Sequence, residues 1–208
     1  MHSISDYQPG LSTLSTTYLS SPMRKVLSCA MGTFSHVEGG LPTMVDVSSK
    51  QITRRVARAR CVVRLPREVA ELVSDAASGG AEILSKKGPV FSTAVVAGVL
   101  AAKRTSELIP FCHPLPLDRC DIDIEVGPAL EEPLGYRDVE LTCTVAVDAK
   151  TGVEMEALTG CSVAALCVYD MCKSVSHGIV IRDTHLVEKT GGKSGGVVPA
   201  AEIRRSTE

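Results

Sequence analysis

The stretch Thr151–Lys173, TGVEMEALTGCSVAALCVYDMCK, decides the fold, because it has the pattern of one long helix. Small and apolar residues cover most of its circumference, which is typical of a helix buried in a core. It nevertheless carries Glu154 and Glu156 at its start, and Asp170 and Lys173 near its end. Buried charges are costly unless they are paired or used. The sequence therefore predicts a functional site along this helix.

The charged residues of this helix fall into two groups that cannot touch. At 1.5 Å of rise per residue, Glu156 and Asp170 share nearly one face but lie about 21 Å apart. We expect them to bind opposite ends of a long ligand, or to serve different parts of an assembly. Asp170 and Lys173 are close enough in sequence to meet on the helix surface. The alternative is a simple surface ion pair, with N-terminal carboxylates that only complement the helix dipole.

The segments around this helix predict an α+β fold. DIDIEV and VELTCTVAV alternate in the period of strands with one buried face. The expected order is strand, two helices, two strands, helix and strand, which favours an antiparallel sheet with the helices on one face. This order resembles a ferredoxin-like βαββαβ plan with an added helix. The remaining strands are expected at 57–65 and 179–187, and the two earlier helices at 66–78 and 91–108.

Composition limits the class of protein. A chain of 208 residues with 44% hydrophobic content suits one well-packed domain. The net charge of −2 gives no basic excess for nucleic acid, and no apolar run approaches the roughly 20 residues of a membrane span. The eight cysteines form no CxxC pair. We therefore expect reduced structural thiols, with no metal site or disulfide framework, in a reducing compartment.

The ends of the chain differ from its middle. Residues 1–42 are rich in Ser and Thr without apolar periodicity, so we predict a flexible N-terminal extension. The domain is expected at 43–197, followed by a flexible tail at 198–208. A signal peptide is disfavoured because the extension has no apolar core. We expect a cytoplasmic protein, or one of an organelle matrix if the extension is a transit peptide.

Four segments suggest a phosphorylated ligand. KKGPVF, at 86–91, opens a helix whose free N–H groups suit an anion. The loop after that helix carries His113, which suits phosphate contact or proton transfer. The basic segment 44–60 has no aromatic residues to stack on bases, so it fits a small polyphosphate better than nucleic acid. The loop KTGGKSGG, at 189–196, is no Walker loop because Val187 replaces the required glycine, but it can close over phosphate.

Taken together, these blocks resemble one known family. MVDVSSK, KKGPVF, AGVLAAKRTSELIPFCHPL, KTGVEMEALT, VYDMCK and KTGGKSG, between about Phe34 and Gly195, are similar to the molybdenum cofactor biosynthesis protein C family, the cyclic pyranopterin monophosphate synthases. Two features depart from that family: Pro89 stands where an acidic residue is frequent, and the N-terminal extension is unlike short bacterial members.

The resemblance implies a reaction and an assembly. The substrate would be (8S)-3',8-cyclo-7,8-dihydroguanosine 5'-triphosphate, the cyclised dihydro-GTP that a radical SAM GTP cyclase supplies. The products would be cyclic pyranopterin monophosphate and diphosphate. The resemblance also implies that the protein forms a homohexamer, a trimer of dimers, with each active site at a subunit interface. No cofactor is implied as required, and the one metal left open is Mg²⁺ bound to the polyphosphate.

The resemblance also implies which residues act. Asp170 and Lys173 would be the catalytic acid–base pair. The substrate-binding residues would be Asp46, Arg55, Lys87, Lys103, Cys112, His113, Glu154, Glu156 and Lys189. Three other hypotheses remain open: a non-catalytic pterin- or nucleotide-binding module, a scaffold for an enzyme of the same pathway, and an RNA-binding protein that uses the basic patch at 54–60.

Overall fold

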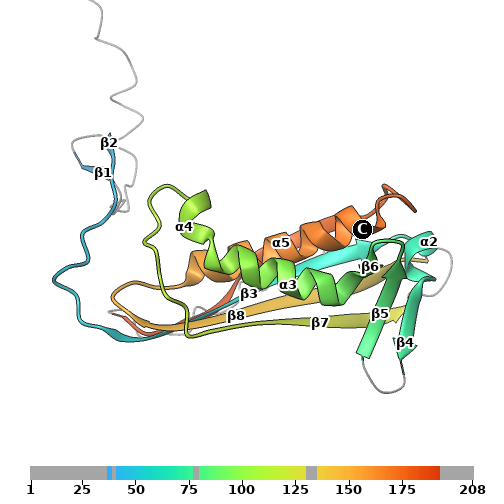
Figure 1. Cartoon of the computed structure of the whole chain (residues 1–208), viewed down its shortest axis with the longest axis horizontal. Coiled ribbons are helices and arrows are strands. Elements are labelled where there is room, and N and C mark those ends of the chain that lie inside the picture. Colours follow the sequence, from blue (N-terminus) through green and yellow to red (C-terminus); the bar gives the residue numbers. More distant parts are fainter. Residues whose placement is uncertain (1–36, 39–40, 77–79, 130–134, 193–208) are drawn as a thin grey trace, which may run out of the picture.

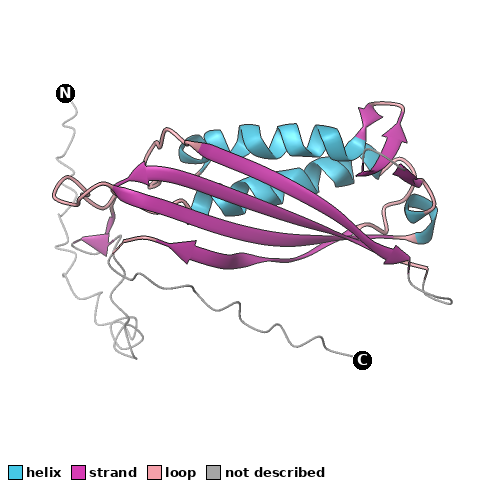
Figure 2. Cartoon of the chain, turned by 90° about the horizontal axis from the view of Figure 1, so that it is seen from below, coloured by secondary structure: helices cyan, strands magenta, loops and turns pink. Residues whose placement is uncertain are grey.

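One antiparallel sheet and two long helices form the body of the protein, which is seen here in a computed structural model that describes residues 37–38, 41–76, 80–129 and 135–192. The four-stranded sheet has the order β7-β8-β3-β9. Helices α3 and α5 lie side by side across one face of it (Figures 1 and 2). The bounds are β3 Thr53–Leu65, α3 Val90–Lys103, β7 Arg119–Ala129, β8 Arg137–Ala149, α5 Glu154–Cys172 and β9 Val180–Thr190.

The prediction of an α+β fold with an antiparallel sheet and helices on one face is confirmed. Smaller elements surround this body. They are β1 Val37–Glu38, β2 Leu41–Pro42, α2 Arg67–Ala70, β4 Val73–Ala76, β5 Gly80–Ser85, β6 Gly88–Pro89 and α4 Thr105–Leu108. β1 pairs with β2, within the predicted N-terminal extension. Residues 1–36 of that extension and the predicted tail at 198–208 lie outside the described residues.

The helix expected at 66–78 is wrong beyond Ala70. Only α2 forms, and the chain then enters β4, which pairs with β5 in antiparallel register from Val73 opposite Ile83. A short amphipathic helix depends on packing for its stability. Here the hairpin buries Ile83 fully and Val73 partly against the core, while Leu72 stays half exposed. Tertiary packing thus overrides the local helical pattern.

The helix expected at 91–108 forms in two pieces. α3 ends at Lys103, Arg104 leaves the helical region with φ −107° and ψ 12°, and α4 begins at Thr105. The buried Thr105 hydroxyl donates to the carbonyl oxygens of Ala101 and Ala102, at 3.3 and 3.0 Å. A threonine that bonds back to the preceding turn commonly bends a helix.

The core lies between the sheet and the helices. Alternate residues of β3 and β8 are buried, as the two-residue period requires. Small residues let α3 and α5 approach closely, because a Cβ on Gly98 would lie 2.7 Å from the carbonyl oxygen of Gly160. Seven cysteines lie in the described residues, and none of these seven forms a disulfide there; Cys29 lies outside them.

α5 is also long and apolar enough, by length and composition, to cross a membrane. The expectation that no apolar run approaches the length of a membrane span is therefore wrong for this helix. Half of that stretch is buried inside the fold, and core helices commonly meet the same criterion. The burial therefore favours the role of a core helix.

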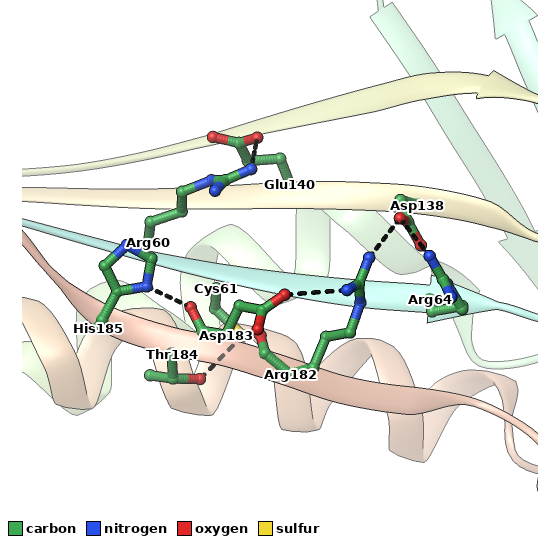
Figure 3. A network of polar contacts seen from close by, with 9 residues as sticks. All are labelled: Arg60, Cys61, Arg64, Asp138, Glu140, Arg182, Asp183, Thr184 and His185. Carbon is green, nitrogen blue, oxygen red and sulfur yellow. Dashed lines mark hydrogen bonds and ion pairs between the residues drawn. The ribbon is translucent and has the colours of Figure 1, made fainter. Parts of the chain in front are cut away.

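The face of the sheet away from the helices carries a ladder of charge pairs (Figure 3). Asp138 accepts from Arg64 at 2.8 Å and from Arg182 at 2.7 Å. Arg60 pairs with Glu140 at 2.5 Å. Much of the basic patch at 54–60 that suggested RNA is therefore already neutralised, since Arg54 also pairs with Asp118 at 2.7 Å.

Candidate active site

A cavity of about 480 Å³ opens at the N-terminal end of α5. Its walls come from the segment after β2, the loop after α4, the turn before α5, and β9. Five of the predicted substrate-binding residues line it, although they are scattered over 78 positions of sequence. They are Cys112, His113, Glu154, Glu156 and Lys189. We call this space the first cavity.

Polar contacts within one chain fix these side chains. Lys189 Nζ donates to Glu154 Oε1 at 3.0 Å, which ties β9 to the start of α5. His113 donates from Nε2 to the carbonyl oxygen of Val45 at 2.9 Å, which holds the loop after α4 against the segment after β2. The next residue, Asp46, accepts from the backbone N–H of Ser48 at 2.8 Å, and this bond lowers the pKa of Asp46.

A second cavity of about 510 Å³ adjoins the first and shares Lys50, Thr151 and Gly152 with it. The cations Lys50, Arg55 and Lys150 line this second cavity, and its lining includes no acidic residue. Arg55 donates to the carbonyl oxygens of Ala149 and Lys150, each at 3.4 Å. Such a cationic space suits a polyphosphate chain.

Two of these cations, Lys50 and Lys150, were not among the site residues predicted from the sequence. Lys50 lies in the basic segment 44–60, and Lys150 begins the block KTGVEMEALT, so both were in view. Nothing in the sequence reveals that the segment after β2 folds back over the turn before α5. Lys150 Nζ makes that contact by donating to the carbonyl oxygen of Ser48 at 2.7 Å.

Glu156 differs from every other charged residue of the first cavity because it is 4% exposed. Burial raises the pKa of its carboxyl, and the nearby Glu154 adds to the effect. Cys112 lies in the same wall, and burial raises the pKa of its thiol, with a further contribution from Glu156. The first cavity is thus lined both by paired or solvated charges and by two groups, Glu156 and Cys112, whose pKa is raised by burial.

The predicted catalytic pair lies at the other end of α5. Lys173 Nζ contacts Asp170 Oδ1 at 2.7 Å, and Lys87 Nζ contacts Asp170 Oδ2 at 2.9 Å. The hydrogen bond from Lys173, followed by that from Lys87, lowers the pKa of Asp170 to about 2. We call these three residues the lysine–aspartate cluster. Each of their side chains is about half exposed.

Lys87 reaches this cluster from a tight turn between β5 and β6. The Ser85 hydroxyl accepts from the backbone N–H of Lys87 at 3.1 Å and donates to the carbonyl oxygen of Gly88 at 3.0 Å. Gly88 has φ +113°, a backbone conformation that favours glycine. The KKGPVF block therefore positions a lysine for Asp170, and the first N–H groups of α3, on Phe91 and Ser92, already donate to the Glu82 carboxylate rather than to an anionic ligand.

The structure thus divides the predicted site into two parts. Five predicted residues line the first cavity, Arg55 lines the second, and Asp46 stands between Val45 and Val47, which line the first. Lys87, Asp170 and Lys173 line neither cavity, and neither does Lys103 at the end of α3. Across the described ranges, no group of three His, Cys, Asp or Glu side chains is arranged to hold a metal ion.

Comparisons with known proteins agree on one family. The model of the MoaC family matches residues 44–192. A cyclic pyranopterin monophosphate synthase of Xanthomonas oryzae is 53% identical over 156 residues, which cover 75% of this chain and 87% of that protein.

Two longer proteins also match. The molybdenum cofactor biosynthesis bifunctional protein of Synechocystis is 48% identical, and molybdenum cofactor biosynthesis protein 1 of Dictyostelium discoideum is 46% identical, each over 77% of this chain. The matches cover only 44% and 26% of those two proteins.

Proposed function

We propose that this chain, which belongs to the MoaC family, is a cyclic pyranopterin monophosphate synthase of molybdenum cofactor biosynthesis. It would convert cyclised dihydro-GTP into cyclic pyranopterin monophosphate and diphosphate. One observation carries the proposal: the helix with a carboxylate between two lysines at one end borders, at its other end, a cavity that adjoins a second, cationic cavity. The first feature suits proton transfer, and the second suits a triphosphate with a heterocycle attached.

The two cavities support a division of the substrate. We propose that the triphosphate occupies the second cavity, where Lys50, Arg55 and Lys150 balance its roughly four negative charges. The heterocycle then lies in the first cavity, against Glu156 and Cys112. Lysines also stabilise the charge of the departing diphosphate. We propose that no cofactor is required and that any Mg²⁺ arrives with the triphosphate.

The lysine–aspartate cluster supports the proton-transfer step. Asp170, with its lowered pKa, is ionised beside Lys173, and Asp170 in turn raises the pKa of Lys173, which therefore carries a proton. We propose that the two act as a coupled acid–base pair during ring opening and closure, with Lys87 balancing the charge of the carboxylate. Lys103 would approach the phosphates from the end of α3.

A single chain keeps these two parts apart, which supports an active site shared by two copies. The helix between Glu156 and Asp170 spans about 21 Å. In the proposed trimer of dimers, the lysine–aspartate cluster of one copy closes the cavities of the next. The upstream partner would be a radical SAM GTP cyclase. We expect the enzyme in the cytoplasm, or in an organelle matrix if residues 1–42 act as a transit peptide.

The order of elements supports a ferredoxin-like fold. Without the small elements, the chain runs β3, α3, β7, β8, α5 and β9, and the sheet order β7-β8-β3-β9 fits the βαββαβ plan. The hairpin of β4 and β5 replaces the added helix that the sequence suggested.

The proposed reaction is tested by turnover. The purified chain, given cyclised dihydro-GTP, should release one diphosphate for each pterin formed. Absence of turnover would favour a scaffold, and tight binding without turnover would favour a non-catalytic module.

The shared site is tested by co-expressing two inactive variants. Lys173→Ala and His113→Ala damage opposite parts, so a mixed pair of chains has one intact site, and random pairing restores about a quarter of the sites. Lys173→Ala with Asp170→Asn is the matched control, because both damage the same part and should restore nothing. An active monomer of 22.0 kDa would overturn the shared site.

A further inference from the structure

Two glutamates stand two residues apart at the start of α5, yet their surroundings differ. Glu154 is paired with Lys189 at 3.0 Å. Glu156 is 4% exposed, and no ion pair to it exists among the described residues. Both line the first cavity. Neighbouring carboxyls in unlike surroundings commonly take different protonation states and different roles.

The groups that face Glu156 come from four parts of the chain. Its own backbone N–H and the start of the helix favour the ionised form. Among the lining residues, Lys50, His113 and Lys189 also carry or can carry positive charge. Lys189 is already committed to Glu154, and none of the three lies within ion-pair distance of Glu156 in the part of the chain described.

Against ionisation stand burial and the negative charge of Glu154. The thiol of Cys112 in the same wall supplies no charge, because its own pKa is raised. Burial is the largest of these effects, and it favours the neutral acid. An ionised carboxyl without a cation is among the costliest groups to bury.

We infer that Glu156 is protonated in the resting protein and that it offers the substrate heterocycle a hydrogen-bond donor and an acceptor side by side. This inference rests on the proposed function. A neutral carboxyl has one O–H donor and one C=O acceptor, whereas a carboxylate only accepts. The neutral form complements the lactam edge of a guanine-type ring, which has one carbonyl oxygen and one ring N–H. The ionised form would instead complement the ring N–H and the exocyclic amine.

The protonated state makes Glu156 a substrate-binding residue that recognises the lactam tautomer of the ring. A heterocycle that has lost its carbonyl oxygen leaves the buried O–H unpaired, and a site built this way rejects it strongly. Glu154 instead stays ionised as the partner of Lys189, because its charge holds Lys189 at the cavity wall.

The test compares three substitutions by kcat/KM for the cyclised dihydro-GTP. Glu156→Gln should lose far less of kcat/KM than Glu156→Leu, because the amide also offers a donor and an acceptor. Glu156→Leu should lose roughly a hundredfold, because the substrate edge then loses its partners. Glu154→Gln, the matched control, should also lose roughly a hundredfold, because it leaves Lys189 without its carboxylate. Equal losses for Glu156→Gln and Glu156→Leu would overturn the inference.

A second measurement does not depend on activity. At neutral pH, the infrared spectrum of the wild type should show the carbonyl band of a protonated carboxyl, and this band should be absent from Glu156→Gln. Raising the pH should remove the band and lower kcat/KM of the wild type in parallel, and this fall should be absent from the pH profile of Glu156→Gln. No difference in the band would contradict a protonated Glu156. If the proposed reaction were wrong, turnover would be missing from the wild type while the infrared result still stood.

Discussion

The two ends of α5 have opposite environments. At the N-terminal end, Glu156 is buried, Glu154 is paired, and two cavities open beside them. At the C-terminal end, Asp170 and its lysines lie on open surface, each about half exposed. The first end is already shaped to hold a ligand, whereas the second has charged groups without walls. Proton transfer benefits from the exclusion of water, so the exposed end has most to gain from a covering surface.

The largest effect is expected at the exposed end. Lys173→Ala should lower kcat by roughly 10³-fold, since positioned acids and bases contribute 10²–10⁴-fold. The thermal midpoint should hardly change, because Lys173 is exposed and buries little area. Diphosphate release from cyclised dihydro-GTP measures the first quantity, and a thermal melt measures the second.

The matched control is another exposed pair on a helix. Glu71, the residue that caps the C-terminal end of α2, accepts from Arg67 at 3.1 Å. Glu71→Ala should leave kcat unchanged. Full activity in Lys173→Ala would mean that the lysine–aspartate cluster is an ordinary surface pair, and the contrast between the two ends would lose its functional meaning.

The next effect concerns the packing that keeps the two ends at a fixed distance. Gly98→Ala would set a Cβ 2.7 Å from the carbonyl oxygen of Gly160, where the two long helices meet. Overpacking of this kind costs about 1–3 kcal/mol of folding free energy, which chemical denaturation can measure. The control is Val96→Ala on the same helix, because Val96 is largely exposed. Equal stability for both variants would show that the helices can separate freely.

Much of this fold could be predicted from periodicity. The alternation in β7 and β8 and the apolar circumference of α5 were sufficient to predict the sheet and its central helix. The hairpin of β4 and β5 could not be predicted in the same way, because REVAELVSDAAS has a helical pattern. Its strand forms only because a partner strand follows and Ile83 enters the core.

The site was only partly predictable for a related reason. Motif blocks pointed to His113, Glu154 and Lys189, which do meet in the first cavity. The 21 Å estimate also separated the two ends correctly, since no cavity-lining residue comes from the end of α5. Sequence could not tell which glutamate is paired, because the partner of Glu154 lies 35 residues away on β9.

A smaller effect should distinguish the two glutamates by stability alone. The pKa of Glu156 is raised in the folded state, so the folded protein binds more protons than the unfolded chain above pH 4.5. The contribution of this group to stability is therefore greatest below the unfolded pKa and is lost as the pH rises. Glu156→Gln should melt higher than the wild type at neutral pH, and the difference should shrink towards pH 4. Glu154→Gln should melt lower, because Lys189 loses its partner.

At the exposed end, the corresponding change is a shift in titration. Lys173 has the largest influence on the pKa of Asp170, which is about 2, and Lys87 comes next. Lys87→Met should raise this pKa only part of the way towards 3.8, and Lys173→Ala should raise it further. Titration of the Asp170 carboxyl carbon by NMR measures both. An unchanged pKa in both variants would show that the lysines do not hold the carboxylate in solution.

The smallest effect is expected on the open face of the sheet, far from the contrast at the ends of α5. Asp138 accepts from Arg64 and Arg182, which lower its pKa, yet its side chain is 34% exposed. Exposed pairs contribute about 0–1 kcal/mol, and salt screens them. Asp138→Asn should therefore cost less than about 1 kcal/mol of unfolding free energy, less still in high salt, with kcat unchanged. Because a lowered pKa stabilises only while the carboxyl is ionised, the cost should shrink as the pH falls below the pKa of an ordinary aspartate and vanish below the lowered pKa of Asp138. A loss of kcat comparable to that of Lys173→Ala would mean that exposure does not separate the catalytic charges from the structural ones.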